Sequence, residues 1–207
     1  MSQQYFDPMP VSESREREIT FEYRGNTCRC LTDAGTFSRD GLDMGTYLML
    51  ESVDELPPCR VLDLGCGWGP VTVALGQAFP GLAITCLDVN PRALGLAERN
   101  AAANGVRVTP ILSDGIGEGT GRFDRVFLNP PIRAGKSTVY RLFRDAAAHL
   151  EADGEMRVVI RKQQGAESAV RELKGIFASV DTLLKKKGYW VIGCRGPAAG
   201  TGEGELE

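Results

Sequence analysis

The residues with the clearest chemical potential are an Asn-Pro-Pro tripeptide at positions 129–131 and a glycine-rich run at positions 63–69. In the tripeptide, the side-chain carbonyl of Asn129 and the backbone carbonyl of Pro130 can both accept hydrogen bonds from one amino group. Two successive prolines after a strand forbid further ladder bonding, so Pro131 completes a rigid turn. The tripeptide therefore indicates a site that holds a planar NH2 group for reaction at its nitrogen.

The glycine-rich run reads Asp-Leu-Gly-Cys-Gly-Trp-Gly, beginning at Asp63. Its glycines, Gly65, Gly67 and Gly69, let the backbone turn sharply and approach a ligand closely. A carboxylate at this place repels a pyrophosphate but attracts a cationic amino-acid group. We therefore expect all four residues to bind a nucleotide-like cofactor that carries such a cation. The alternative is a packed turn that binds no ligand.

Two further acids follow the next apolar runs. Asp88 lies 23 residues after Gly65, close to the spacing of about 20 residues expected for an acid that binds a ribose. Asp88 could instead cap the following helix, but Asn90 and Pro91 already supply a cap and a first-turn proline. Asp114 stands in a Ser-Asp-Gly sequence, where an Asp-Gly turn is the alternative to ligand binding.

Elements that alternate between strand and helix must position these residues, as in an α/β fold with a parallel sheet. Strands are expected at 61–64, 83–87, 108–112, 126–128 and 156–160, and helices at 70–79, 91–103 and 137–153, with a later helix carrying Val170, Leu173 and Phe177. Strands 180–184 and 189–194 are joined by too short a link for a crossover, so the last strand should be antiparallel. Alternating residues from 18 to 31 predict an N-terminal hairpin, and a helix follows around 47–51.

The motifs together carry a family resemblance. The glycine-rich run resembles motif I of the class I S-adenosylmethionine-dependent methyltransferases, and Asn-Pro-Pro resembles motif IV of those that act on exocyclic or amide nitrogens. With Gly35-Thr-Phe-Ser38 and Asp43-Met-Gly-Thr46, residues 18–194 are similar to the methyltransferase small-domain family, which includes ribosomal RNA guanine-N2 methyltransferases. The runs 132–136, 160–165 and 186–190 resemble its stand-alone, single-domain branch.

This resemblance implies a Rossmann-like, seven-stranded methyltransferase sheet with helices on both faces. It implies S-adenosylmethionine as the cofactor, with Thr46 in contact with it and Asp114 at its adenine amino group. It implies Asn129, Pro130 and Pro131 as the catalytic residues, which need no metal.

The same resemblance places Phe37 over the mouth of the site. The family usually has Phe or Tyr after Asn-Pro-Pro, stacking on the base, whereas this chain has Ile132, which offers no π-stacking. Phe37, Trp68 and Tyr140 are candidates to replace that aromatic ring.

Length and composition agree with this organisation. The chain has 207 residues, 43% of them hydrophobic, which predicts a polar arm at 1–17, a methyltransferase domain at 18–195 and a disordered tail at 196–207. Within the domain, residues 18–55 form the hairpin and helix, and 56–195 form the cofactor-binding core. No apolar stretch or leader predicts membrane insertion, so we expect a cytoplasmic protein. Six cysteines without a C-x-x-C pair, and one histidine, argue against zinc.

Charge is distributed unevenly along the chain. The net charge is −3, but residues 133–187 carry 12 Lys or Arg against 7 Asp or Glu, whereas residues 1–132 carry 11 against 17. The basic part begins directly after Asn-Pro-Pro, so it is suited to grip phosphates around a presented nucleotide. The expected contacts are Arg133, Lys136, Arg141, Arg161 and Lys162. The alternative is a solvated helix face with a solubilising turn at 185–187.

The sequence thus favours an N-methyltransferase that modifies an exocyclic amino group of an RNA base, with guanine N2 of ribosomal RNA as the first choice. An enzyme that methylates a protein glutamine amide or a small molecule, and a binding module without catalysis, are the alternatives. The target nucleotide and the oligomeric state are left open.

Overall fold

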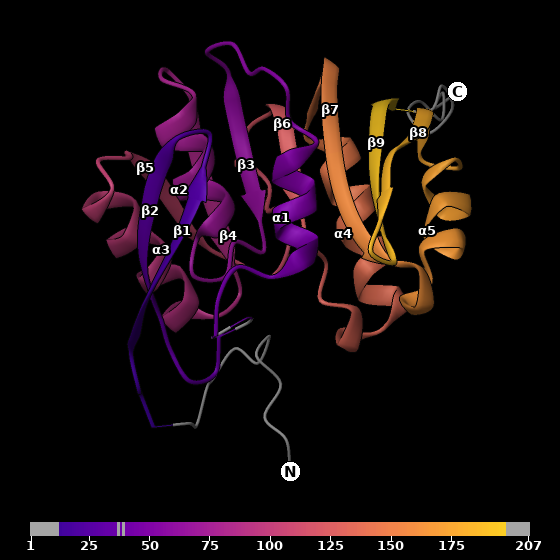
Figure 1. Cartoon of the computed structure of the whole chain (residues 1–207). Helices are drawn as coiled ribbons and strands as arrows, with labels where there is room; N and C mark the ends of the chain where they lie inside the picture. The colour runs from indigo at the N-terminus through magenta and orange to yellow at the C-terminus, as the bar shows by residue number, and fades with distance from the viewer. Residues whose placement is uncertain (1–12, 37, 39, 198–207) are drawn as a thin grey trace.

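The computed structural model describes residues 13–36, 38 and 40–197. They form a two-stranded hairpin and a seven-stranded sheet with helices packed against it (Figure 1). The strands are β1 (Arg17–Tyr23), β2 (Asn26–Thr32), β3 (Arg60–Leu64), β4 (Ala83–Asp88), β5 (Val108–Leu112), β6 (Phe123–Leu128), β7 (Leu150–Arg161), β8 (Phe177–Lys186) and β9 (Tyr189–Pro197). The helices are α1 (Met44–Glu51), α2 (Pro70–Ala78), α3 (Pro91–Ala103), α4 (Lys136–Ala148) and α5 (Ala166–Leu173), with single 3-10 turns η1 (Ile132–Ala134) and η2 (Lys162–Gln164).

The large sheet has the strand order β5-β4-β3-β6-β7-β9-β8. β3 pairs in parallel with both β4 and β6, and β9 is antiparallel to both of its neighbours, β7 and β8. The predicted seven-stranded sheet with an antiparallel last strand is therefore confirmed. The chain proceeds outward from β3 to β5 and then returns to β6 on the other side of β3. Ligands bind at such a switch point, beyond the carboxyl ends of the strands.

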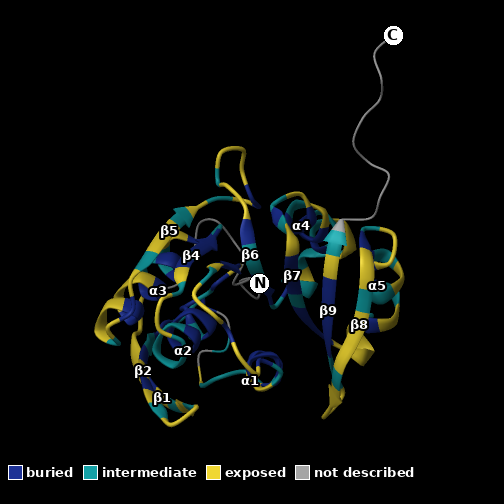
Figure 2. Ribbon diagram, turned by 90° about the horizontal axis from the view of Figure 1, so that it is seen from above, coloured by how far each residue is buried: buried dark blue, intermediate teal, exposed yellow. Residues whose placement is uncertain are grey.

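Helices cover both faces of this sheet, as expected (Figures 1 and 2). Successive side chains of a strand point to opposite faces. In β3, Val61 joins the apolar cluster under α1, α2 and α3, whereas Leu62 and Leu64 join the cluster under α4 and α5. The central strands are therefore buried on both sides, which explains their continuous apolar sequences.

Asn100 of α3 and Asn104, the C-cap of that helix, dock the N-terminal hairpin. The Asn100 side chain accepts from Leu31 N at 2.7 Å and donates to Leu31 O at 2.9 Å. One turn later, Asn104 makes the same pair of bonds with Arg29, at 3.1 and 2.7 Å. These side chains satisfy backbone groups on the free edge of β2, which is otherwise open to another strand. Asn100 also donates to Trp68 O at 2.8 Å, so the hairpin and the glycine-rich loop share an anchor.

The boundary between α4 and β7 differs from the prediction. We expected the helix to end at Asp153-Gly154, but α4 ends at Ala148 and β7 begins at Leu150. The pairing between β6 and β7 shifts in register within this stretch. The Asp-Gly sequence therefore marks a bulge inside β7 rather than the end of a helix.

The end of α5 is also earlier than expected. We assigned Phe177 to this helix, but α5 ends at Leu173 and Phe177 is the first residue of β8. Lys174 is the C-cap of α5, and a tight turn follows, in which Gly175 N donates to Glu172 O and Ile176 N donates to Leu173 O, both at 2.9 Å. Phe177 is buried in both assignments, so its apolar character did not distinguish them.

The chain ends extend the predicted domain slightly. Ser14 and Arg15 donate hydrogen bonds to the buried carboxylate of Asp33, so part of the predicted arm is anchored. Residues 196 and 197 belong to β9 instead of the predicted tail. Residues 1–12 of the arm and 198–207 of the tail lie outside the described residues. No helix in the described part of the chain is long and apolar enough to cross a membrane.

Candidate functional site

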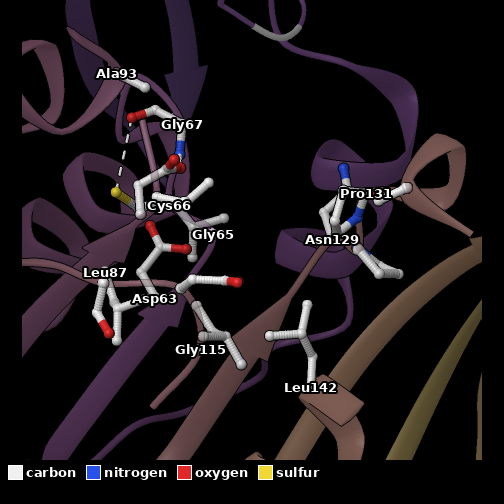
Figure 3. A pocket seen from close by; sticks show the side chains of 18 of the residues that line it. Asp63, Gly65, Cys66, Gly67, Leu87, Ala93, Gly115, Asn129, Pro131 and Leu142 are labelled. Carbon is white, nitrogen blue, oxygen red and sulfur yellow. Dashed lines mark hydrogen bonds between the residues drawn. The ribbon is translucent and has the colours of Figure 1, made fainter. Parts of the chain in front are cut away.

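A cavity of about 310 Å³ lies at the switch point (Figure 3). Asn129 and Pro131 stand on one side of it in this view, with Gly65, Cys66 and Gly67 opposite. The predicted site residues that line it are Thr46, Asp63, Gly65, Gly67, Asp88, Asp114, Asn129, Pro130 and Pro131. Among residues 13–36, 38 and 40–197, no three His, Cys, Asp or Glu side chains are grouped to hold a metal ion.

The three glycines of the loop have two different roles. Gly65 and Gly67 have φ angles of +71° and +57°, and both line the cavity. Gly69, with φ of +83°, does not line it, although we expected it to bind the cofactor. A Cβ at Gly69 would lie 2.9 Å from the Cα of Ala97. The third glycine therefore permits close packing of the loop against α3.

Asp63 is buried at the cavity wall, with 4% of its surface exposed. Its Oδ2 accepts hydrogen bonds from the backbone N of Thr72 at 3.1 Å and from the Thr72 hydroxyl at 2.7 Å. Burial raises the pKa of Asp63 to about 7, despite the lowering effect of these hydrogen bonds. An incoming cation that pairs with this carboxylate would relieve the cost of its ionisation.

Asp88 holds the loop and faces the same cavity. Its Oδ2 accepts from Gly67 N at 2.8 Å, and its Oδ1 accepts from Asn90 N at 2.9 Å. Burial raises the pKa of Asp88, against the lowering effect of its backbone hydrogen bonds. Asn90, not Asp88, caps α3, so the capping alternative for Asp88 does not hold. Each carboxylate oxygen retains acceptor capacity for a ligand hydroxyl.

Asp114 lines the cavity but also forms an ion pair. Its Oδ1 lies 2.6 Å from Nη2 of Arg141, and its backbone oxygen accepts from Arg141 Nη1 at 3.0 Å. Arg141 also faces Asp145 at 3.6 Å. The charge of Arg141, which we expected to contact phosphate, is thus engaged by acids at the cavity.

The Asn-Pro-Pro segment forms a tight, fixed turn. Pro131 has φ of −74° and ψ of 78°, and Ile132 N donates to Pro130 O at 2.8 Å across it. These values describe an inverse γ-turn, in which proline already supplies the required φ. The Pro130 carbonyl keeps one lone pair for a further donor.

The amide of Asn129 has a defined polarity. Its Nδ2 donates to Asp43 Oδ2 at 2.8 Å and to Thr46 Oγ1 at 3.0 Å. The Thr46 hydroxyl donates its own proton to Asp43 Oδ2 at 2.6 Å, so both partners of Asn129 act as acceptors. This side of the amide must therefore be NH2. No donor among the described residues contacts Oδ1, which leaves this oxygen for a ligand.

Three residues predicted to contact the substrate, Ile132, Arg133 and Lys136, do not line this cavity. Ile132 and Lys136 line a second hollow of about 30 Å³ beside Tyr140, and Arg133 is exposed. Phe37 lies outside the described residues. Trp68 is only 1% exposed and packs edge-on against Phe21, so it is not available to stack on a large substrate.

Exposed cations gather at the carboxyl ends of the parallel strands, the edge of the sheet at which the cavity lies. They stand where β7 ends and β8 turns into β9 (Figure 1). We call Arg161, Lys162, Lys185 and Lys187 the basic rim. Lys162 N donates to Gly188 O at 2.8 Å, which joins the two segments. The guanidinium of Arg161 lies 4.8 Å from the ring centre of Tyr189, and the ammonium of Lys185 lies 4.0 Å from that of Trp190. The basic rim is therefore supported by aromatic rings.

Sequence reasoning gave no role to two residues that shape the site. Thr72 holds Asp63, and Asp43 holds Asn129. Asp43 was visible as the first residue of an Asp-x-Gly-Thr motif. Its partner stands 86 residues later in the chain, so nothing in the local pattern disclosed the contact.

Comparison with known proteins gives a family match over most of the chain. Residues 27–193 match the family model described as methyltransferase small domain. The chain is 36% identical over 197 residues to the uncharacterized protein YbxB of Bacillus subtilis, covering 93% of this chain and 98% of that protein.

Other similar proteins are longer than this chain. It is 37% identical over 157 residues to ribosomal RNA small subunit methyltransferase C of Escherichia coli K12, covering 74% of this chain and 45% of that enzyme. A solved structure of the Thermus thermophilus 16S rRNA N2 G1207 methyltransferase, in complex with AdoMet and guanosine, superposes with a TM-score of 0.79 at 23% identity. This match covers 91% of this chain and 52% of the other. The chain thus spans about half the length of these relatives.

Proposed function

The chain belongs to the methyltransferase small-domain family, as its motifs predicted, and from this we propose that it is an S-adenosylmethionine-dependent N-methyltransferase acting on RNA. The favoured target is an exocyclic amino group of a base, with guanine N2 of ribosomal RNA first. The names of the longer relatives support this choice, since they methylate ribosomal RNA and one was solved with AdoMet and guanosine.

The cavity fits the proposed cofactor in size and in chemistry. Its volume of about 310 Å³ falls at the lower end of the range of about 300–1,000 Å³ that is typical of small-molecule sites. Asp88 would accept the ribose hydroxyls and Asp63 would attract the cationic amino-acid part. Gly65 and Gly67 allow the ligand to approach the backbone, with Thr46 and Asp114 beside it. When bound, S-adenosylmethionine supplies an electrophilic methyl group.

The polarity of Asn129 is the observation that carries the proposed reaction. Asn129 Oδ1 and Pro130 O present two acceptors on one rigid turn, which suits the two hydrogens of one amino group. Acceptors aimed at these hydrogens stabilise positive charge that develops on the nitrogen. Holding the nitrogen in line with the methyl group would lower the activation free energy further, because the reacting atoms are already aligned. We therefore assign catalysis to Asn129 and Pro130, with Pro131 fixing their geometry.

The basic rim supports a nucleic acid as the substrate. Arg133, Lys136 and the basic rim expose cations at the edge of the sheet where Asn129 stands. Phosphate contacts of this kind position a strand without reading its sequence. Ile132 would then pack against a base face, and Phe37 would lie at the mouth. We also propose that residues 18–195 form a single methyltransferase domain and that the protein acts in the cytoplasm.

Methyl transfer from labelled S-adenosylmethionine tests the proposal. The substrates are ribosomal subunits, naked ribosomal RNA and total protein from cells that lack this protein, and the wild type is compared with Asn129→Ala. We expect label in RNA with the wild type only, and calorimetric binding of cofactor by both proteins. Label in protein alone would favour the glutamine-amide alternative. Bound cofactor without label in any fraction would contradict RNA methylation.

A further inference from the structure

We propose that Asp43 is the positioning residue that sets the polarity of the Asn129 amide, so that its oxygen rather than its NH2 group faces the methyl acceptor. The proposal rests on the proposed function, because it assigns Asp43 a task in the same site. Asp43 would contact neither the cofactor nor the RNA and would act only through Asn129.

Asp43 is placed to do this by four hydrogen bonds to its carboxylate. Oδ1 accepts from Gly45 N at 2.9 Å, and Oδ2 accepts from Thr46 N at 2.8 Å and from the Thr46 hydroxyl at 2.6 Å. The fourth donor is Nδ2 of Asn129, at 2.8 Å from Oδ2. A carboxylate that is ionised only accepts hydrogen bonds. It therefore selects the NH2 side of the amide.

Thr46 reinforces the same choice. A hydroxyl can donate or accept, but the Thr46 proton is directed to Asp43. Its oxygen then accepts from Asn129 Nδ2 at 3.0 Å. Reversing the amide of Asn129 would place its oxygen against two acceptors and turn its NH2 toward the amino group of the substrate, where two donors would meet.

The segment that carries Asp43 is fixed by packing. Asp43 caps the first turn of α1, in which Gly45 and Thr46 are buried. A Cβ at Gly45 would lie 3.0 Å from Cε1 of Tyr189, so this turn lies directly against the start of β9. The Asn129 amide is therefore oriented by a rigid element that belongs to neither the glycine-rich loop nor the Asn-Pro-Pro turn.

Asp43→Asn separates this role from helix capping. Asparagine and aspartate are similarly good N-caps, so α1 should form in the variant. However, the new side chain can place its own NH2 toward Asn129, and the two NH2 groups then face each other until the Asn129 amide rotates. The matched control is Asp40→Asn, which removes a carboxylate from an 85% exposed position in the same loop.

The first readout is the side-chain amide resonance of Asn129 in protein with 15N-labelled asparagine, assigned by its absence in Asn129→Ala. In the wild type we expect slow hydrogen exchange of this NH2 group, because both of its protons are bonded to the protein. In Asp43→Asn the resonance should move and its exchange should accelerate. An unchanged resonance in a folded Asp43→Asn variant would overturn the proposal, whether or not RNA is the substrate.

The second readout is kinetic. Misplacing one preorganised group at a reacting centre typically lowers kcat on the order of 100-fold, and we expect this for Asp43→Asn while its cofactor Kd stays within about threefold. Thr46→Val should lower kcat less, and Asp40→Asn should match the wild type. If Asp43→Asn lowers the melting temperature too far for these measurements, the Asn129 amide resonance is measured in Thr46→Val instead. A wild-type kcat in Asp43→Asn would overturn the proposal, whereas an absence of RNA methylation by the wild type would refute only the proposed function.

Discussion

The two sides of the switch point are built differently. On the side of β3 and β4, a short stretch of chain makes the cofactor wall, because Asp63, Gly65 and Gly67 lie within five residues and Asp88 bonds directly to Gly67. On the side of β6, Asn129 takes its polarity from Asp43, 86 residues earlier. The proposed cofactor wall is thus encoded locally in the sequence, whereas the proposed presentation of the methyl acceptor depends on contacts that only the folded chain creates.

The two sides also differ in charge. The cofactor wall carries two buried carboxylates, and burial raises the pKa of both Asp63 and Asp88. The acceptor side instead exposes the cations of the basic rim. This difference suits a small cationic ligand on one side and a large anionic substrate on the other.

Substitutions that remove one side and spare the other should have the largest effects. Asn129→Ala should lower kcat by about 10²–10³-fold, since one preorganised group at the reacting centre is removed, with the cofactor Kd unchanged. Asp88→Ala should instead weaken the cofactor by about 10–100-fold, because hydrogen bonds to a charged group contribute about 1.5–3 kcal/mol. Calorimetry and steady-state kinetics on both variants check this. Parallel losses of binding and turnover in both would contradict a division between the two sides.

Acidification should act on the cofactor side alone. Because the pKa of Asp63 is about 7 in the unliganded protein, this carboxyl is mostly protonated below that pH and no longer attracts a cation. Cofactor affinity should therefore fall as pH drops below about 7, by up to about tenfold per pH unit, and be flat above it. Asp63→Asn should bind weakly and without this pH dependence, as measured by calorimetry between pH 5.5 and 8.5. An equally steep dependence in Asp63→Asn would assign the titration to another group.

On the cofactor side, we expect substitution of Gly69 to affect packing and substitution of Gly65 to affect packing less. Gly69→Ala should lower the free energy of unfolding by about 1–3 kcal/mol, because its methyl group would meet Ala97 and its φ is positive. Gly65→Ala has the same kind of backbone strain but no neighbour within 4 Å, so it should cost less. Urea unfolding of both variants measures the difference. Equal losses would show that strain alone, and not packing against α3, governs Gly69.

The smallest expected effect concerns the basic rim. Lys185→Ala combined with Lys187→Ala should weaken binding of naked ribosomal RNA. It should also reduce the slope of log K against log salt by about 0.7 for each phosphate that the variant no longer neutralises. The control is Lys174→Ala, which removes an exposed lysine at the amino edge of the sheet. Titrations at several salt concentrations provide the slopes. An equal change of slope in the control would indicate that the basic rim is a solvated surface that does not bind phosphate.

What could be predicted from sequence follows the same division. The strand, glycine loop and helix around Asp63 were predictable because apolar run, glycine spacing and first-turn proline are local signals. Asp88 was assigned to the site by its distance from the loop. The alternative, that Asp88 caps α3, was already unfavourable because Asn90 supplies that cap. The motif containing Asn129 was also recognised, but the direction of its amide was not, because Asp43 and Thr46 reach it only through the tertiary fold.

The errors arose where one local signal fits two structures. Asp153-Gly154 is typical of a helix end, yet it forms a bulge in β7, since the turn into the strand had already occurred at Leu150. At Gly69 the ligand-binding pattern did not disclose a second role, since its missing side chain makes room for Ala97. In both cases a neighbouring element decides the outcome, and residue type alone does not report that neighbour.

The most direct measurement is the chemical identity of the methylated product. Ribosomal RNA from cells that lack this protein would be treated with the wild-type protein and S-adenosylmethionine, digested to nucleosides and analysed by mass spectrometry. We predict a new purine methylated on its exocyclic nitrogen, with N2-methylguanosine first, and formation that is about 10²–10³-fold slower with Asn129→Ala. A methyl group on ribose or on a ring carbon, formed equally by Asn129→Ala, would contradict the central claim that the Asn-Pro-Pro turn presents an amino group for methylation.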